Sequence, residues 1–392
     1  RIQHSTWCWE KQSKRRERRL LPTAKAGGSR RHRIWWNRHP DHRPAVIVQA
    51  AGTADVVAAV RFAARHDLPV SVKSGGHQVA GLGAGEGAVM VDMTRMRAVV
   101  VDPLARTAVV QGGATARDVI RGTQAFGLAL PTGNIGRVGV AALALGGGMG
   151  FLRRRYGLTC DHLLGADLVL ADGTFIHVDA IHHPDLFWAI RGGGGNFGIA
   201  VSLYVRLVPV GPVVAGIHTV YRFADAEAVL TRCRTFLAQC GDDVSVNIDI
   251  MAVPPAPGVP PFLAGQTVVM VSGMHAGAHL DEAVETVQPV RTWAEPLMDQ
   301  TGPMDYGALH AVLDHLLPEA HQGYMESMDV RELSDPLIQT VTAIMAEAQP
   351  GQMCLIWPLG AKWPANRKRP PPSATGGRGC WWRGKRVGRI PG

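Results

Sequence analysis

Four glycine-rich segments, interleaved with strand-like runs, constrain this chain more than any other feature. They are SGGHQVAG (74–81), PTGNIG (131–136), LGGGMG (145–150) and RGGGGNFG (191–198), which together span about 125 residues. Because glycine has no side chain, backbone N–H groups in such segments can approach a ligand closely and surround phosphate groups. A single cluster would be interpreted as a tight turn. Four in one domain favour a long polyphosphate ligand bound across several loops.

Two common nucleotide-binding motifs do not account for these glycines. Gly193, Gly195 and Gly198 match the spacing GxGxxG, but a helix-like run precedes them and a strand-like run follows. In a dinucleotide-binding fold the order is the reverse, because the motif follows a strand and opens the helix that holds the pyrophosphate. The pattern GxxxxGK[ST] does not occur, which excludes a P-loop. The match to GxGxxG is therefore interpreted as fortuitous.

Hydrophobic patterning predicts two α+β domains that meet near Pro209 and Pro212. The first domain, 41–210, is expected to contain a mixed sheet, with a helix capped by Thr53. The second domain, 211–360, is expected to form an antiparallel sheet with helices on one face. In the first domain, strands are expected at 44–50, 68–74, 88–93, 98–102, 106–113 and 198–210, helices at 114–127 and 183–191, and a hairpin at 166–180.

The two ends of the chain differ in composition from its middle. Residues 1–40 hold 12 Lys/Arg and 2 Asp/Glu, and residues 361–392 hold 9 Lys/Arg and no acid, so the middle is acidic although the whole chain carries +9. Seven of the ten tryptophans also lie in these ends. Neither end has sustained strand or helix periodicity. Both are therefore predicted to be disordered or unrelated to the fold, and nucleic-acid binding through them is the alternative interpretation.

Composition also limits compartment and chemistry. The longest notable uncharged run, 138–152, is shorter than the ~18–20 residues of a membrane span and rich in glycine, so no membrane association is expected. The N-terminus has arginine clusters and no apolar segment of a signal peptide, which favours the cytoplasm. The six cysteines form no CxxC pair, which gives little support to a zinc site or a redox dithiol, and no metal is predicted.

His77 lies inside the first glycine cluster, between Gly76 and Gln78. A loop histidine is most often a solvated side chain. Among glycines beside a bound cofactor, a neutral imidazole can instead act as a nucleophile, a base or an anchor.

The first domain resembles the flavin domain of the berberine-bridge-enzyme-like flavoproteins, in the vanillyl-alcohol-oxidase superfamily with a PCMH-type FAD-binding domain. The matching segments, in the order of the family, are PVSVKSGGHQVAG, VDMTRM, PTGNIGRVGVAALALGGGMGFLRRRYGL, DLVLADG and HPDLFWAIRGGGGNFGIAV. The second domain resembles the family more loosely, mainly over 306–333 and the SDPLIQ that follows. The resemblance implies an α+β fold in which the FAD-binding domain precedes a substrate domain.

The resemblance also implies the site. In the family the histidine of the SGGH motif bonds covalently to the 8α carbon of FAD, and His77 occupies that position. The backbone of 74–76 would line the pyrophosphate, 131–139 and 146–148 the flavin and ribityl chain, and 198–201 the adenine side. The residues so assigned to FAD are Ser74, Gly75, Gly76, His77, Gln78, Val79, Pro131, Thr132, Gly133, Ile135, Gly136, Val138, Gly139, Gly146, Gly147, Gly148, Gly198, Ile199 and Val201.

Three positions depart from the family pattern. Ile135 stands where some members have a cysteine that forms a second covalent bond to the flavin, so a single attachment is implied. Gly136 and Ala142 stand where relatives often have a serine or threonine and a glycine, and both changes leave the loop plausible. The resemblance stops near Gly360, before a segment that in relatives returns to the flavin, so the substrate domain is expected to be incomplete and the chain truncated.

Other candidate residues give weaker signals. His310 and Asp314 share a helix face and His315 follows, but a metal site needs a third ligand close by, and a solvated helix face is the simpler interpretation. The run 153–155, three arginines, is interpreted as an exposed turn or a phosphate contact. Tyr324 follows the glycine in HQGYMES, where relatives place residues that face the substrate, and is the candidate catalytic residue.

The implied activity is that of an FAD-dependent oxidoreductase. The substrate is expected to be an alcohol, a sugar or a similar hydroxyl-bearing small molecule, and molecular oxygen the electron acceptor. The alternatives are an inactive, truncated fragment of the flavin fold and a nucleic-acid-binding protein.

Overall fold

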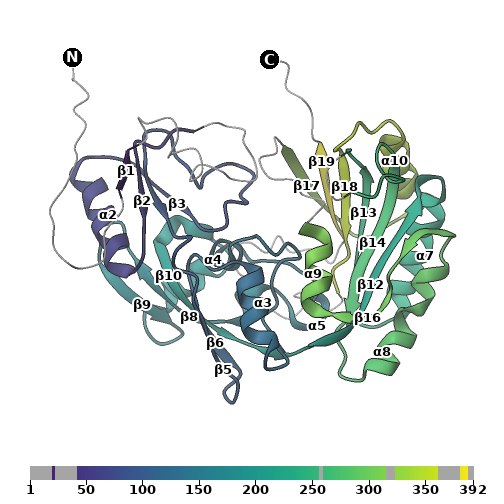
Figure 1. Cartoon of the computed structure of the whole chain (residues 1–392), viewed down its shortest axis with the longest axis horizontal. Helices are drawn as coiled ribbons and strands as arrows, with labels where there is room; N and C mark the ends of the chain where they lie inside the picture. Colours follow the sequence, from purple (N-terminus) through teal and green to yellow (C-terminus); the bar gives the residue numbers. More distant parts are fainter. Residues whose placement is uncertain (1–19, 23–41, 256–258, 315–322, 361–379, 387–392) are drawn as a thin grey trace.

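The computed structural model describes residues 20–22, 42–255, 259–314, 323–360 and 380–386. Two lobes are visible in Figure 1, the first built from residues up to Pro209 and the second from Val213 onward. The short strand β11 (Val208–Pro209) pairs with β7 (Leu128–Ala129) and is the last element of the first lobe.

The first lobe contains two sheets. In the smaller sheet the order is β1-β2-β4-β3, and β4 pairs in parallel with both β2 and β3. Helix α2 covers it with the buried residues Val56, Ala59, Val60 and Ala63. The bounds are β1 Leu20–Pro22, β2 Val46–Gln49, α2 Thr53–Arg65, β3 Val70–Lys73 and β4 Val89–Asp92.

The larger sheet of the first lobe is antiparallel, in the order β5-β6-β10-β8-β9. Its strands are β5 Val99–Asp102, β6 Thr107–Gln111, β8 Leu163–Val169, β9 Phe175–Asp179 and β10 Ile199–Arg206. The expected hairpin is confirmed, with its turn at Asp172 and Gly173. A mixed sheet was expected in this lobe, and the smaller sheet is mixed, since β1 is antiparallel to β2 while β4 is parallel to β2 and β3. The larger, wholly antiparallel sheet is separate from it.

Short helices connect these strands. They are α3 Ala116–Gln124, α4 Val140–Leu145, α5 Arg153–Tyr156, η1 Thr159–His162, α6 Pro184–Ile190 and η2 Gly194–Phe197. Of these, α3, α4 and α6 pack on the larger sheet, whereas α5 contacts the second lobe. Thr115 and Asp118 form a capping box at α3, which satisfies two free amides of its first turn. By contrast Thr53 is the first helical residue of α2 and does not cap it; the carboxylate of Asp55 instead accepts the amide of Ala51 at 2.9 Å.

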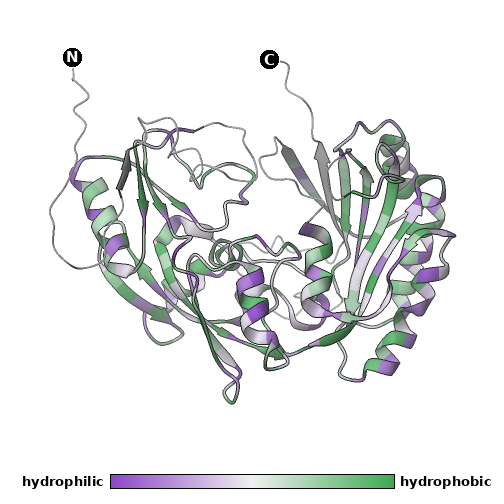
Figure 2. Ribbon diagram, viewed as in Figure 1, coloured by the Kyte–Doolittle hydropathy of each residue, from purple (hydrophilic) through white to green (hydrophobic). Residues whose placement is uncertain are grey.

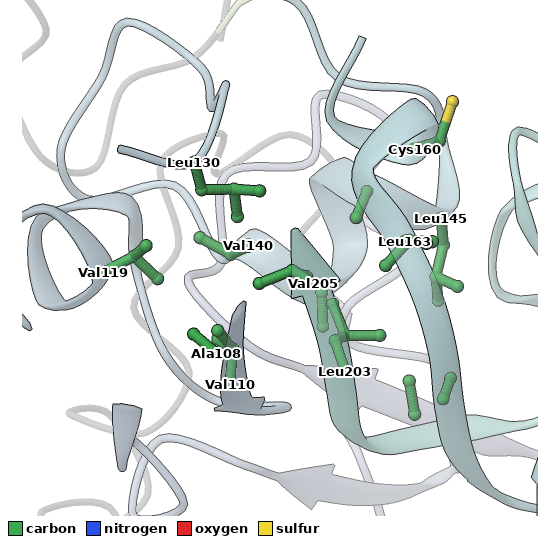
Figure 3. Close-up of a cluster of buried hydrophobic side chains, with 14 of the residues drawn as sticks. Ala108, Val110, Val119, Leu130, Val140, Leu145, Cys160, Leu163, Leu203 and Val205 are labelled. Carbon is green, nitrogen blue, oxygen red and sulfur yellow. The ribbon is translucent and has the colours of Figure 1, made fainter. Parts of the chain in front are cut away.

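The hydrophobic core of the first lobe lies between these helices and the larger sheet. Figure 3 shows its side chains converging from β6, α3, α4 and β10. Figure 2 shows hydrophobic residues along the strands, whereas helices such as α3 and α7 carry both kinds of residue, as expected where one face is buried.

The second lobe is a large antiparallel sheet with helices α7, α8 and α10 on one face (Figure 1). Its path is β15-β12-β14-β13-β18-β19-β17, and β16 also pairs with β12. Helix α9 lies on the opposite side, against α3 of the first lobe. The bounds are β12 Val213–Arg222, η3 Phe223–Asp225, α7 Ala226–Gln239, β13 Val244–Ala252, β14 Thr267–His275, α8 Leu280–Val287, η4 Gln288–Thr292, β15 Pro296–Asp299, β16 Gly302–Asp305, α9 Tyr306–Asp314, β17 Tyr324–Val330, α10 Asp335–Ala346, β18 Met353–Trp357 and β19 Cys380–Arg386.

Two segments of the basic ends differ from the sequence expectation. Leu20–Pro22 pairs with β2, and Cys380–Arg386 lies between β17 and β18. Backbone N–H and C=O groups make these ladders, so pairing does not require the alternating pattern by which strands are found in a sequence. The remainder of both ends lies outside the described residues, and so does the nucleic-acid-binding alternative based on them. Within the described part, no helix has the length and apolar character needed to cross a membrane.

Candidate functional site

The glycine-rich loops of the first lobe pack backbone against backbone. The SGGH loop follows β3, and there the Ser74 hydroxyl donates to the Gly112 carbonyl at 2.8 Å. A Cβ on Gly75 would lie 2.3 Å from the amide nitrogen of Gly139, and one on Gly139 would lie 2.2 Å from Ser74 Oγ. Since real Cβ atoms do not come this close, only glycine permits the two loops to touch.

The other clusters join the same assembly. A Cβ on Gly150 would lie 1.7 Å from the carbonyl oxygen of Thr132, and a Cβ on Gly112 would lie 2.1 Å from the carbonyl oxygen of Ala200. The amide of Gly112 donates to the Val201 carbonyl at 2.9 Å, and that of Gly192 donates to Leu145 at 2.9 Å. Segments spread over about 125 residues of sequence thus meet in one place, as a ligand laid across several loops requires.

The predicted FAD-contacting residues differ in exposure along this assembly. Gln78 and Gly146 are exposed. The partly buried ones are Gly75, Gly76, His77, Val79, Ile135, Val138, Gly148 and Gly198, and the buried ones are Ser74, Pro131, Thr132, Gly133, Gly136, Gly139, Gly147, Ile199 and Val201. His77 directly follows Gly76, whose φ of 74° favours glycine.

Several buried polar atoms beside these loops have no hydrogen-bond partner among the described residues. They are the hydroxyls of Thr132 and Thr159 and both side-chain amide atoms of Asn134. Buried polar groups are normally hydrogen-bonded, so these atoms fit a polar ligand such as the ribityl chain or the ring edge of a flavin coenzyme. The sequence analysis included Asn134 in the segment 131–139 without naming it, although it is the polar residue inside PTGNIG, and it missed Thr159.

The three arginines of α5 are neither an exposed turn nor a phosphate contact; they join the lobes. Arg153 is 2% exposed and donates to three carbonyls, those of Gly150 (3.1 Å), Val246 (2.7 Å) and Pro358 (3.0 Å). Arg154 donates to the Val244 carbonyl at 2.7 Å, and Arg155 pairs with Asp243 at 3.0 Å. The sequence interpretation was wrong because β13 and its flanking residues, far along the chain, supply the acceptors.

Helix α9 forms a second junction, where the prediction of a solvated helix face is wrong. Both His310 and Asp314 are buried. The Asp314 carboxylate accepts the Gly136 amide at 2.8 Å and the Arg117 guanidinium at 2.5 Å, so α9 holds the PTGNIG loop. Burial lowers the pKa of His310 to about 4, which keeps this imidazole neutral beside Gly133 and Asn134. His315 lies outside the described residues, and within them no group of three or more metal-ligating side chains occurs.

On the second sheet, polar side chains face the first lobe. His218, Ser272 and Asn247 lie directly opposite one another on β12, β14 and β13, and we call these three the polar row. They share their face with Val220, Met251, Met270 and Met274, which pack in one cluster with Phe151 and Leu152 of the first lobe. Sequence reasoning missed the row, because its members are single polar residues within separate apolar strands.

Titratable groups at the row are perturbed by burial. The pKa of His218 falls to about 4, because burial disfavours its cation. Asp249, two residues from Asn247 on the same face, has its pKa raised by burial to about 7, while the Trp357 side chain and the charge of Arg153 act in the opposite direction.

The raised pKa of Asp249 predicts a pH-dependent stability. Between the unfolded pKa near 3.8 and the folded value of about 7, the native state holds a proton that the unfolded state has lost, so stability falls as pH rises through this window. The loss approaches roughly 1.4 kcal/mol per pH unit. Urea unfolding at pH 5 and at pH 7 is expected to show this loss in the wild type and not in Asp249→Asn. Equal pH dependence in the two proteins would contradict the assignment.

The side chain of Tyr324 points away from the lobe junction. It begins β17, is 62% exposed, and its hydroxyl donates to Glu326 at 2.5 Å, which raises the pKa of the phenol. The pairing register through β19 places it on the face of Ile356, which packs against the helices, and not on the face of Trp357. Its catalytic role stays a prediction.

Comparison with known proteins identifies the first lobe. Residues 44–179 match the family model of the FAD binding domain. (R)-6-hydroxynicotine oxidase of Paenarthrobacter nicotinovorans is 40% identical over 174 residues, which are 44% of this chain and 38% of that protein. The chain spans less than half the length of the first curated relatives that it matches, from 38% to 47%.

Solved structures share the architecture of both lobes. BBE-like 1 of Physcomitrella patens has a TM-score of 0.81 at 22% identity, over 95% of this chain and 82% of that one. Glucooligosaccharide oxidase of Acremonium strictum, described with a 6-S-cysteinyl, 8α-N1-histidyl FAD, has a TM-score of 0.76 at 22% identity, over 94% and 80%. The expected α+β fold with a PCMH-type FAD-binding domain is confirmed.

Proposed function

We propose that the chain belongs to the berberine-bridge-enzyme-like FAD-linked oxidoreductases and is an oxidase of a hydroxyl-bearing small molecule that carries FAD bound covalently through His77. One observation carries the proposal. The four glycine-rich loops converge, and the hydroxyls of Thr132 and Thr159 and the amide of Asn134 are buried there without partners among the described residues. A long coenzyme with phosphates, a ribityl chain and a polar ring supplies the partners that these groups lack.

Each segment of the site has a role in this proposal. The backbone at Ser74–Gly76 surrounds the pyrophosphate, and the loops at 131–139 and 146–148 hold the flavin and ribityl chain. Residues 198–201 hold the adenine side. When bound, FAD supplies the acceptor for a hydride that leaves a substrate C–H bond. The second lobe covers the ring, orients the substrate and receives the hydroxyl proton.

The relatives support an oxidase that acts on a small molecule. Their names include an oxidase of 6-hydroxynicotine and an oxidase of glucooligosaccharides. Molecular oxygen is the proposed electron acceptor. Oxygen uptake on addition of a panel of alcohols and sugars tests this part of the proposal, and turnover only with an artificial dye would indicate a dehydrogenase instead.

Substitution of His77 tests the covalent link. After denaturation in acid, the wild-type protein is expected to stay yellow, while His77→Ala is expected to release all of its flavin into the supernatant. His279→Ala is the matched control, because this exposed histidine makes no side-chain cap at α8 and should keep the flavin attached. Retention of flavin by His77→Ala would show that the flavin is attached to another residue. Well-folded wild-type protein without FAD would contradict the proposal that the chain is an oxidoreductase.

A further inference from the structure

Methionines gather on the face of the second sheet that meets the first lobe. Three are buried and three are partly buried against them, and we call the six together the methionine face: Met251, Met270, Met274, Met298, Met304 and Met353. The whole chain contains 13 methionines. Within the described residues, the core on the helix-covered face of the same sheet contains one methionine, Met345. Methionine is therefore concentrated where the two lobes meet.

The pairing register of the strands makes this face continuous. Met251 lies directly opposite Met353, and Met270 and Met298 lie on either side of Val220. Side chains directly opposite one another in such a sheet are about 4.5–5.5 Å apart at Cβ. The Met304 side chain lies on β12 at Gly216, where a Cβ would overlap its sulfur atom. The six thioethers thus line one surface at the junction.

The same hydrophobic cluster reaches the coenzyme loops. Ile135 of the PTGNIG loop packs against it, and Phe151 and Leu152, which follow the LGGGMG loop, belong to it. In the proposed function molecular oxygen takes up two electrons and two protons at the coenzyme and leaves as hydrogen peroxide. Peroxide formed there is released beside the methionine face.

Methionine differs from other apolar residues in its reaction with peroxide. The thioether sulfur attacks one peroxide oxygen, the O–O bond breaks and an S–O bond forms. The sulfur loses two electrons to become a sulfoxide, and the second oxygen leaves with both protons as water. Methionine also fills irregular gaps in cores, and packing alone is the simpler explanation of the cluster. The two explanations differ in one observable, the sulfoxide.

We propose that the methionine face is a site of oxidative modification, at which the peroxide that the protein itself forms converts Met298, Met304 and Met353 to sulfoxides. These three are the partly buried members, and peroxide is small enough to reach them. The proposal rests on the proposed function, and specifically on oxygen as the electron acceptor. Each sulfoxide places a polar oxygen among apolar side chains such as Phe151, so oxidation weakens the contact between the lobes.

Repeated reduction and reoxidation of the holoprotein tests this proposal without a known substrate. The flavin is reduced under argon with an equimolar amount of dithionite and reoxidised in air with catalase present, and peptide mass spectrometry then measures the sulfoxide at each methionine. Catalase destroys peroxide in the bulk solvent and is too large to enter the lobe junction. Sulfoxide is expected to be about threefold higher or more at Met298, Met304 and Met353 than at Met328, which is 51% exposed on β17. With added peroxide, and without reduction or catalase, Met328 is expected to be oxidised first.

Leucine substitutions connect oxidation with the junction. After the cycles, the Tm of the wild type is expected to fall by about 2–4 °C or more. The combined variant Met298→Leu, Met304→Leu and Met353→Leu is expected to keep its Tm, because leucine has a similar volume and does not form a sulfoxide. Met328→Leu is the matched control and should lose as much stability as the wild type.

The outcomes separate this inference from the proposed function. Equal oxidation of Met328 and the methionine face, or a methionine face that stays reduced after the flavin has been reoxidised, would overturn the inference and leave packing as the role of these side chains. Mass spectrometry of the wild type decides this even if the combined variant does not fold. Reduced flavin that air does not reoxidise would instead defeat oxygen as the acceptor, and this inference with it. Folded protein without FAD would defeat the proposed function as a whole.

Discussion

Replacement of Gly150 by alanine is expected to abolish flavin binding and to destabilise the protein by about 3 kcal/mol or more. The added Cβ would lie 1.7 Å from the Thr132 carbonyl oxygen and 2.8 Å from its carbon, and both are backbone atoms that no rotamer change can move. One of these two loops must therefore shift, which separates it from the other glycine-rich loops that pack against it. Flavin content and urea unfolding of the variant measure the two effects.

Gly195→Ala is the control for this substitution. Gly195 also belongs to a glycine-rich cluster, but it is exposed, and a Cβ there would meet nothing within 4 Å. Its stability and flavin content should match the wild type. Equal behaviour of the two variants would show that glycine at 150 is not required for loop contact.

Arg153→Ala is expected to lower the free energy of unfolding by about 3–5 kcal/mol, because it leaves three buried carbonyl oxygens without their donor, each worth about 1–3 kcal/mol. Those carbonyls belong to Gly150, Val246 and Pro358, so the variant also loosens the contact between the lobes. Urea unfolding gives the stability, and limited proteolysis reports the exposed junction.

Arg155→Ala is the matched control on the same helix. Its side chain is 32% exposed and pairs with Asp243, whose side chain is 47% exposed. Such solvent-exposed pairs contribute about 1 kcal/mol or less. If Arg155→Ala lowered the free energy of unfolding as much as Arg153→Ala does, this would contradict the view that Arg153 stabilises the protein because it is buried.

The sequence predicts what depends on local pattern. The strands at 88–93 and 98–102 and the helix at 183–191 all occur close to their expected bounds, because alternation, length and glycine boundaries are local properties. The GxGxxG match was correctly rejected on the same ground, since α6 precedes it and β10 follows. The loops that converge were also identified, because four glycine clusters in one domain favour a shared ligand over four unrelated turns.

What the sequence did not predict depends on how the lobes meet. Arg153 and Asp314 look like surface residues when only their neighbours in sequence are considered. The partners that join each to the other lobe lie far along the chain, 93 and 205 positions away for Arg153 and 178 and 197 for Asp314. The polar row was missed for the same reason, because the pairing register of three strands brings together residues that are isolated in the sequence. A helix-like spacing of His310 and Asp314 raised the question of a metal, whereas burial between lobes accounts for both.

The carboxylate of Asp314 has one further consequence. It binds the amide of Gly136 through one oxygen and Arg117 through the other, so a single residue of the second lobe secures a loop and a helix of the first. Unfolding of either lobe breaks these hydrogen bonds and so removes a stabilising contact from the other lobe. We therefore expect differential scanning calorimetry to record one cooperative transition for two separate cores, and two resolved transitions would show that the lobes behave as independent bodies.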